Sequence, residues 1–458
     1  MMMHLLQTSL EALKPFLLPL IFAVTIVAVL PLIAGYIVLM ERKVMAHMQV
    51  RLGPMRVGPH GLLQPIADAV KLLLKEDIIP ESADRLVFWL APLLTVTTAM
   101  LAMAALPFGP GFQIADLNIG LLFVVGISSM GIFGIVLGGW ASNSHYSLLG
   151  ALRSAAQLVS YETAGGMAIV GALLFAGTLS LRNIVEMQEN LGVWFIFAAP
   201  VGFFIYLVAS IAETNRAPFD MPEAESELVA GYMTEYSGFR WALYFLAEYT
   251  NVVVVASIAT TLFLGGWLRP FPHTHALDFL DEFPAALMLG LAVYSLYRAP
   301  KQPVLIQKLV MVLVAGMFAA FAVILLAPMV ATHVAGATSI AMMVASWKPA
   351  LLGGFWFLLK IFLYIYLFMW LRFTFPRYRF DQLMRLGWQF LIPISIVNVM
   401  AIGLGLALHR VWGWPRGLAL ITTTLITLLI AAALAHTGEK KEGSEAMVGE
   451  FWGSGRDA

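Results

Sequence analysis

The chain has 458 residues, of which 60% are hydrophobic and only 12% are charged. A soluble globular domain carries about 25% charged residues, so the composition excludes a water-soluble protein and indicates a polytopic membrane protein. The 27 basic and 27 acidic residues balance, which gives no indication of nucleic acid or another anionic partner. The absence of cysteine excludes a thiolate-held iron–sulfur cluster, a c-type haem and a disulfide framework within this chain.

Apolar stretches predict the membrane spans, each of which needs about 20 predominantly apolar residues. In chain order they are Phe16–Met40, Leu86–Phe108, Ile119–Trp140, Leu158–Leu179, Val193–Ala212, Trp241–Leu268, Val304–Val334, Pro349–Phe373, Leu386–Leu408 and Gly417–Ala435. A shorter stretch, Pro284–Tyr297, could be a thin span, a re-entrant segment or a surface helix. We predict an all-α polytopic membrane protein with one transmembrane domain over residues 1–436 and a polar tail over 437–458.

Basic residues predict the orientation of the spans. The N-terminus has no basic region before its apolar stretch and no small-residue cleavage site, so we expect a first span and not a removed signal peptide. The loop that follows is rich in Lys and Arg and is therefore expected in the cytoplasm. The basic stretch Arg372–Arg385 lies on the same side only if an even number of crossings separates Leu268 from Pro349. Counting Pro284–Tyr297 as a span satisfies this condition and gives about eleven spans, with the N-terminus outside and the C-terminus cytoplasmic.

The first polar cluster follows Glu41-Arg42-Lys43. Two Gly-Pro pairs interrupt regular structure there, and after Gly61 the polar residues follow a helical spacing. The polar residues are Gln64, Asp68, Lys71 and Lys75, which lie at positions i, i+4, i+7 and i+11. One polar stripe on a short apolar helix is typical of an amphipathic helix at the membrane interface. The stripe could belong to a functional site, or the lysines could simply extend from an interfacial anchor toward water.

The second cluster is an acidic loop over residues 213–240. It has six carboxylates between positions 213 and 235, with Arg216 as the one base: Glu213, Asp220, Glu223, Glu225, Glu227 and Glu235. Crowded carboxylates repel one another, so some are expected to hold a proton and to titrate as a coupled set. A proton relay needs that property. A solvated acidic loop is the alternative, but the spans on either side each carry a glutamate, which favours a relay.

Several charged residues fall within the predicted spans. Glu162, Glu213 and Glu248 are the acidic ones, and a carboxylate at the centre of a span costs about 2.5–3.5 kcal/mol on insertion scales. Such residues indicate a hydrated cavity or a relay, although Glu213 could be a partly exposed helix-end residue. Lys360 is a possible partner for one of them, or could extend to the interface.

The third cluster is basic and follows the span that ends near residue 373. It contains Arg372, Arg377, Arg379, Asp381 and Arg385, which by themselves suggest only positive-inside anchors. None of the nine histidines lies deep within a predicted span, so no buried haem b is expected. No metal-binding spacing, nucleotide-binding loop or nucleophile triad is present either. The residues alone leave two classes open, a coupling subunit of a redox pump and a secondary transporter. A transporter would favour matching Gly/Pro breaks in two repeats, which we do not find.

The same clusters closely resemble the NADH dehydrogenase subunit 1 family, the H subunits of the proton-translocating NADH:quinone oxidoreductase, respiratory complex I. The resemblance is carried by the runs ERKVMAHMQVRLGPMRVGPHGLLQPIADAVKLLLKE, GWASNSHYSLLGALRSAAQLVSYE, AETNRAPFDMPEAESELVAGYMTEYSG and FPRYRFDQLMRLGW. It covers residues 16–267 and 350–408. Related ion-translocating subunits of membrane-bound hydrogenases are the alternative within this class.

The resemblance implies a multi-pass subunit of a bacterial inner membrane that forms part of a quinone chamber and does not act alone. It implies that iron–sulfur clusters and FMN are held by partner subunits, that a peripheral partner next to the quinone carries the terminal cluster, and that this chain binds no cofactor by itself. The residues that would border the quinone path are Arg42, Asp68, Lys71, Arg372 and Arg377. The residues of the proton path would be Glu162, Glu213, Glu223, Glu225, Glu227, Glu235 and Glu248.

The stretch 268–349 departs from the family pattern because it is far longer than the connection usual at this point. We expect about nine family-like spans and an extra hairpin within this insertion. Since both family-like parts are complete without it, we predict that the insertion is peripheral to catalysis. The resemblance does not distinguish ubiquinone from menaquinone as the substrate.

Overall fold

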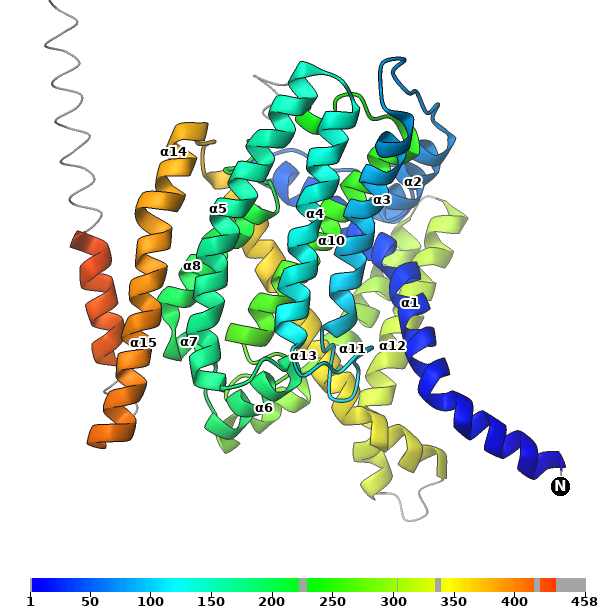
Figure 1. Ribbon diagram of the computed structural model, residues 1–458. Helices are drawn as coiled ribbons and strands as arrows, with labels where there is room; N and C mark the ends of the chain where they lie inside the picture. Colours follow the sequence, from blue (N-terminus) through cyan, green and yellow to red (C-terminus); the bar gives the residue numbers. More distant parts are fainter. Residues whose placement is uncertain (1, 222–228, 303, 334–338, 416–420, 434–458) are drawn as a thin grey trace, which may run out of the picture.

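The protein is a helical bundle, seen in a computed structural model that describes residues 2–221, 229–302, 304–333, 339–415 and 421–433 (Figure 1). The described residues form helices and connecting loops, with one isolated β-bridge between Gly109 and Phe112 and no strand among them. Eight of the described helices are long and apolar enough to cross a membrane. The predicted all-α polytopic membrane fold is confirmed.

The long helices coincide with predicted spans. They are α1 (Met2–Met48), α3 (Arg85–Ala102), α4 (Gly120–Ala141), α5 (His145–Ala176), α10 (Gly238–Phe263), α12 (Leu305–His333), α13 (Ser339–Thr374) and α15 (Ile392–Trp412). The remaining predicted spans contain shorter helices, namely α8 (Pro200–Glu213), α11 (Phe283–Arg298) and the apolar helix Ile421–Ala433. Before α8, the single turn α7 (Phe195–Ala198) is followed by Ala199, whose backbone is non-helical because Pro200 disfavours helical geometry in the residue before it.

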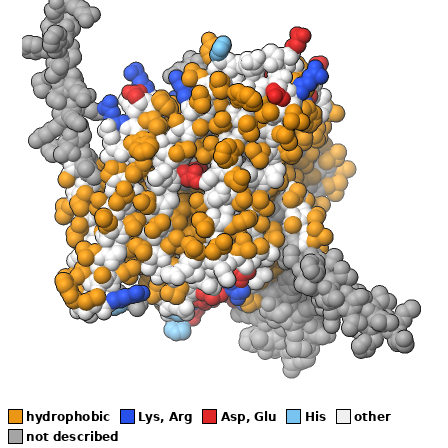
Figure 2. Space-filling model, viewed as in Figure 1, with side chains coloured by type: hydrophobic (Ala, Val, Ile, Leu, Met, Phe, Trp, Pro, Cys, Tyr) orange, Lys and Arg blue, Asp and Glu red, His pale blue; other side chains and the backbone are white. Residues whose placement is uncertain are grey.

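Successive helices that pass through the bundle, the shorter α8 and α11 included, run in opposite directions between its two ends (Figure 1). One end carries α2 (Gln64–Leu74) and α14 (Phe380–Arg385), and we name it the α2 end; the other carries α6 (Leu181–Leu191) and is named the α6 end. Figure 2 shows hydrophobic side chains over the middle of the molecule and most charged ones at the two ends. This distribution suits a bilayer around the middle of the bundle.

Small residues let the helices of the bundle approach one another closely. A Cβ atom at Gly134 of α4 would lie 2.1 Å from the Thr95 hydroxyl of α3, and one at Gly138 would lie 2.1 Å from the Tyr244 hydroxyl of α10. Tyr244 instead donates a hydrogen bond of 3.1 Å to the carbonyl of Gly134. Close backbone approach of this kind is the usual way in which helices pack inside a membrane. Helices packed in this way surround α10, which is the most deeply buried of the eight long helices.

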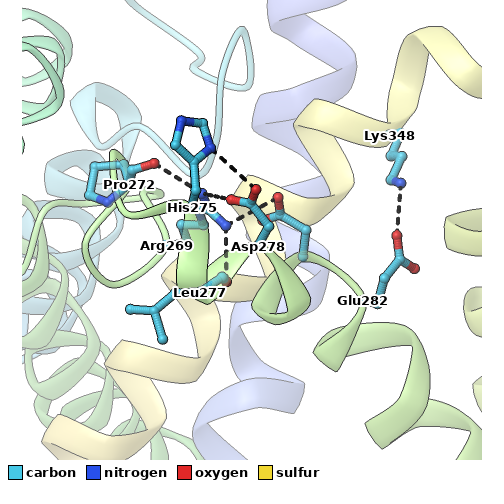
Figure 3. A network of polar contacts seen from close by, with 8 residues as sticks. Arg269, Pro272, His275, Leu277, Asp278, Glu282 and Lys348 are labelled. Carbon is cyan, nitrogen blue, oxygen red and sulfur yellow. Dashed lines mark hydrogen bonds and ion pairs between the residues drawn. The ribbon is translucent and has the colours of Figure 1, made fainter.

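The described residues of the segment 268–349 include a helical hairpin at the edge of the bundle. It contains η4 (His275–Asp281), α11, η5 (Ala299–Lys301) and α12; α11 packs against α12, which also contacts α13 and η1 (Pro59–Gly61). At the base of the hairpin, Arg269 binds Asp278 at 2.7 Å and Asp281 at 3.4 Å, and Lys348 lies 3.5 Å from Glu282 (Figure 3). The hydrogen bond from Arg269 favours the charged form of Asp278 and lowers the pKa of this carboxyl group.

Candidate functional site

An apolar cavity lies between α1, α2 and α10 at the α2 end. Its volume is about 280 Å³, near the lower limit for small-molecule pockets. Its apolar wall includes Leu39 of α1, Leu72 of α2 and Phe245 of α10. As predicted, α2 is a short helix, and Gln64, Asp68 and Lys71 lie on the side that lines the cavity. Lys75, the fourth residue of the predicted stripe, follows the end of the helix with an extended backbone. The site therefore combines an apolar interior with a polar helix at the expected membrane interface.

The polar residues of this cavity centre on Asp68. Its carboxylate accepts hydrogen bonds from Arg42 at 2.8 Å and from Gln64 at 3.0 Å, and the ammonium group of Lys71 lies 3.9 Å away. The side chains of Arg42 and Lys71 are 41% and 66% exposed, so both remain accessible to a ligand. Three of the predicted quinone-path residues are thus brought together in one cluster.

Tyr249 lies between the apolar cavity and the interior of the bundle. It lines the cavity and also a small neighbouring void of about 10 Å³. Its hydroxyl donates a 2.8 Å hydrogen bond to Glu41, which also forms an ion pair with the predicted site residue Arg372. Two adjacent residues of α1 therefore belong to different clusters, because Arg42 binds Asp68 whereas Glu41 binds Arg372 and Tyr249.

A buried ion pair lies next to Tyr249, on the side facing the interior of the bundle. Arg216 lies 3.1 Å from Glu248, and their side chains are only 7% and 10% exposed. The guanidinium group of Arg216 also lies 4.3 Å from the centre of the Tyr249 ring, a cation–π distance. Tyr232 donates a second hydrogen bond to Glu248, at 2.9 Å. Buried charges need such partners, because an isolated ion in a low-dielectric interior is strongly disfavoured.

Glu248 also faces a second, polar cavity of about 40 Å³ between α3, α4, α5, α8 and α10. Glu162 and Glu213 line the same cavity, together with Asn251 and Ser129. Ser129 donates a hydrogen bond to Glu162. A polar space of this size with several hydrogen-bonding groups can hold water. The structure thus brings together the three glutamates that the sequence placed within or at the end of spans.

The other predicted site residues have different positions. Arg377 forms an ion pair of 2.9 Å with Asp220, at the start of the acidic loop. Glu235 is half-buried and lines neither the apolar nor the polar cavity. The remaining predicted proton-path residues lie outside the described residues: Glu223, Glu225 and Glu227.

Lys360 has no carboxylate partner among the contacts of its ammonium group in the described structure. Instead it donates hydrogen bonds to the carbonyls of Leu264, Gly266 and Leu268, at 2.6, 2.9 and 2.6 Å, and lies 4.3 Å from the Trp194 ring. Neither sequence alternative described this role. Lys360 binds the carbonyl groups that follow the C-terminal end of α10, so it stabilises a turn instead of joining the glutamates.

Sequence reasoning noted Glu41 and Arg216 but assigned neither to the site, and it passed over Tyr232, Tyr249 and Ser129. Tyr249 adjoins Glu248 in the chain, which is the only local signal for it. The hydrogen bonds of Tyr249 with Glu41 and of Ser129 with Glu162 join residues 208 and 33 positions apart. Such pairings depend on how the helices pack and have no sequence pattern.

Comparison with known proteins identifies the family. The model of the NADH dehydrogenase family matches residues 20–403. The chain is 52% identical over 394 residues to the second NADH-quinone oxidoreductase H subunit of Solibacter usitatus, and the match covers 84% of this chain and 95% of the relative. The chain belongs to the H-subunit family of NADH-quinone oxidoreductase.

Two further relatives carry the same family name. The first H subunit of Koribacter versatilis is 49% identical over 78% of this chain and 84% of its own length. The H subunit of Magnetococcus marinus is 40% identical over 85% of this chain and 89% of its own length. The protein is therefore a membrane subunit of an enzyme complex, with other subunits of that complex as its partners. This assignment excludes the secondary transporter.

Proposed function

We propose that the apolar cavity forms part of a quinone-binding chamber, and that the polar cavity is the start of a proton path. The observation that carries this proposal is the continuous set of contacts between the two cavities. Tyr249 lines the first cavity and holds Arg216, Arg216 pairs with Glu248, and Glu248 lines the second cavity. A change at one cavity therefore reaches the other through two residue-to-residue contacts.

The chemistry of quinone reduction suits this arrangement. Each quinone takes up two electrons and two protons, and the electrons come from cofactors of partner subunits. The apolar wall suits the isoprenoid tail of a quinone, because burial of apolar surface is favourable. Lys71 and Arg42 can donate hydrogen bonds to a quinone oxygen, and Asp68 is next to both. A carboxylate in this position can also exchange protons with the substrate.

The polar cavity supplies the groups that a proton path requires. Glu162, Glu213 and Glu248 line it, and Arg216 is the cation paired with one of them. Because neighbouring carboxylates titrate as a set, the group can hold different numbers of protons. Water in the cavity would connect carboxylates that are not in direct contact. On the proposed orientation, the α2 end faces the cytoplasm, where the peripheral subunits dock.

A photoreactive quinone analogue tests the quinone assignment in the assembled complex. We expect light-dependent labelling of peptides from Gln64–Leu74 and from Gly238–Phe263, and we expect excess natural quinone to suppress it. Labelling that is confined to other parts of this chain, or that excess quinone does not reduce, would contradict the proposal.

A further inference from the structure

The helix α2 bears Asp68 and Lys71, and the ion pair of Asp68 with Arg42 is one contact that holds it to α1. None of its residues from Gln64 to Leu74 is buried. A helix of this kind cannot be positioned by core packing and needs contacts at its ends. At its N-terminal end, Pro65 packs closely on Gly35 of α1, where a Cβ atom would lie only 2.9 Å from Pro65.

A second anchor lies just after the C-terminal end of α2. The residues 75–78 lie against residues 237–240, which are Ser237 and the first residues of α10, and we name this contact the α2 clamp. The hydroxyl of Ser237 accepts a 2.9 Å hydrogen bond from the Ile78 amide and donates one of 3.4 Å to the Glu76 carbonyl. Arg240 forms an ion pair of 3.0 Å with Asp77.

The Arg240 side chain is an unusual group to find at the edge of a membrane domain. It is 2% exposed, its guanidinium group lies 4.1 Å from the centre of the Trp89 ring, and two of its nitrogens have no hydrogen-bond partner among the described residues. Asp77 is the carboxylate paired with it. Removing one partner of a buried charge leaves the other uncompensated, so the pair resists separation.

The backbone of the clamp is equally constrained. Gly238 has a φ of +54°, which favours glycine, and a Cβ atom there would lie 3.0 Å from the Lys75 carbonyl oxygen. Phe239 and Trp241, which flank Arg240 in sequence, both line the apolar cavity. The clamp therefore fixes α2 to the part of α10 that forms the opposite wall of the cavity.

We propose that the α2 clamp sets the width of the cavity between α2 and α10, with Asp77 and Arg240 as positioning residues for quinone access. This inference rests on the proposed quinone chamber. A looser clamp lets α2 move away from α10 and weakens contact with the substrate, while the residues that touch the quinone stay chemically intact. The clamp therefore acts on the KM for quinone more than on kcat.

The test uses membranes that contain assembled complex, with rates normalised to the NADH oxidation measured with an artificial acceptor upstream of the quinone. Asp77→Asn is expected to raise the KM for a long-chain quinone about threefold to tenfold, with kcat changed by less than about twofold. Asp77→Glu, which keeps the charge, should restore most of the affinity. Glu76→Gln is the matched control, because Glu76 is exposed and contributes its backbone carbonyl to the clamp.

Two further variants keep the test decisive. Ser237→Ala removes one hydroxyl of the clamp and should raise the KM for quinone by a smaller factor than Asp77→Asn. If Asp77→Asn does not assemble, the KM of Ser237→Ala tests the inference instead. An unchanged KM in the assembled clamp variants overturns the inference. If Asp68→Asn alters the rate or the KM of quinone reduction in the same assay while the clamp variants do not, the inference about the clamp is wrong but the proposed quinone chamber is supported. If Asp68→Asn also leaves both the rate and the KM unchanged, the proposed quinone chamber itself is wrong.

Discussion

Arg216 and Glu248 form a buried ion pair at 3.1 Å between residues 32 positions apart, and this pair lies between Tyr249 of the apolar cavity and the polar cavity that Glu248 lines. Arg216 comes from the loop after α8, and Glu248 lies within α10. Both side chains also contact a tyrosine, Tyr249 for the cation and Tyr232 for the carboxylate. Because both charges have further partners, we expect the pair to stabilise the fold as well as to take part in the proposed proton path.

Arg216→Met is expected to destabilise the subunit by about 3–5 kcal/mol, because it leaves Glu248 buried without its cation. The measurement is the thermal inactivation of the complex together with its amount in the membrane. Arg182→Gln is the matched control, since Arg182 pairs with Glu186 at the surface of α6 and such pairs contribute only about 0–1 kcal/mol. Equal stability of Arg216→Met and Arg182→Gln would show that the buried pair does not support the fold.

Glu213→Gln is expected to give an assembled complex with impaired quinone-linked NADH oxidation and impaired proton pumping. The substitution keeps size and hydrogen bonding but removes titration from the polar cavity. We expect a loss of about tenfold or more, since positioned acid–base groups commonly contribute larger factors. Electron transfer from NADH to an artificial acceptor upstream of the quinone should not change.

Two outcomes would argue against a proton-transfer role for Glu213. Wild-type pumping and quinone reduction in Glu213→Gln would make the residue a structural helix end, with the path elsewhere. A parallel fall in the artificial-acceptor activity of the membrane would indicate lost assembly instead. Glu189→Gln, at an exposed position of α6, serves as the control for loss of a glutamate charge.

Asp68→Asn and Lys71→Met are expected to slow quinone reduction with little change in assembly. Asp68 orients Arg42 and Gln64 at the rim of the apolar cavity, and Lys71 is exposed beside it. The measurement is quinone-dependent NADH oxidation in membranes with normal amounts of complex. Lys75→Met is the control, because Lys75 follows the C-terminal end of α2, does not line the cavity, and contributes its backbone to the clamp. Wild-type rates and KM values in both variants would rule out a role in substrate binding.

Deleting residues 284–334 is expected to preserve the orientation of the helices that follow, because the deletion removes α11 and α12, two antiparallel passes. Neither the apolar nor the polar cavity is lined by a residue of this segment, so catalysis should persist. A reporter fused at the C-terminus measures the orientation. Its appearance on the outside would show that the parity assignment is wrong, and loss of quinone reduction in an assembled complex would show that the hairpin is not peripheral.

Much of the fold was predictable because membrane spans have a strong signal in composition and length. The polar stripe of α2 and the glutamates within spans were also predictable, since charged residues in apolar surroundings are costly and therefore conspicuous. The contacts between the polar clusters, however, could not be predicted from the sequence. Glu41 and Arg372 are 331 positions apart, and their pairing depends on the packing of α1 against α13.

Lys360 shows a second limit of sequence reasoning. Its charge within a predicted span suggested a carboxylate partner or extension to the interface, yet its three hydrogen-bond acceptors are backbone carbonyls after α10. Every residue except proline offers both a backbone donor and a carbonyl acceptor, so the sequence does not indicate which carbonyl groups a turn leaves free. The Asp77–Arg240 pair escaped notice for a related reason, because neither residue falls in the interior of a predicted span.

The most direct test of the link between the two cavities is Glu248→Gln in proteoliposomes, with quinone reduction and proton pumping measured in the same sample. The variant keeps the hydrogen-bonding shape of the residue that contacts Arg216 and lines the polar cavity. We predict that both rates fall together when each is normalised to electron transfer to an upstream artificial acceptor, which corrects for any loss of assembled complex. Wild-type rates of both processes, or quinone reduction at the wild-type rate without pumping, would contradict the proposed coupling.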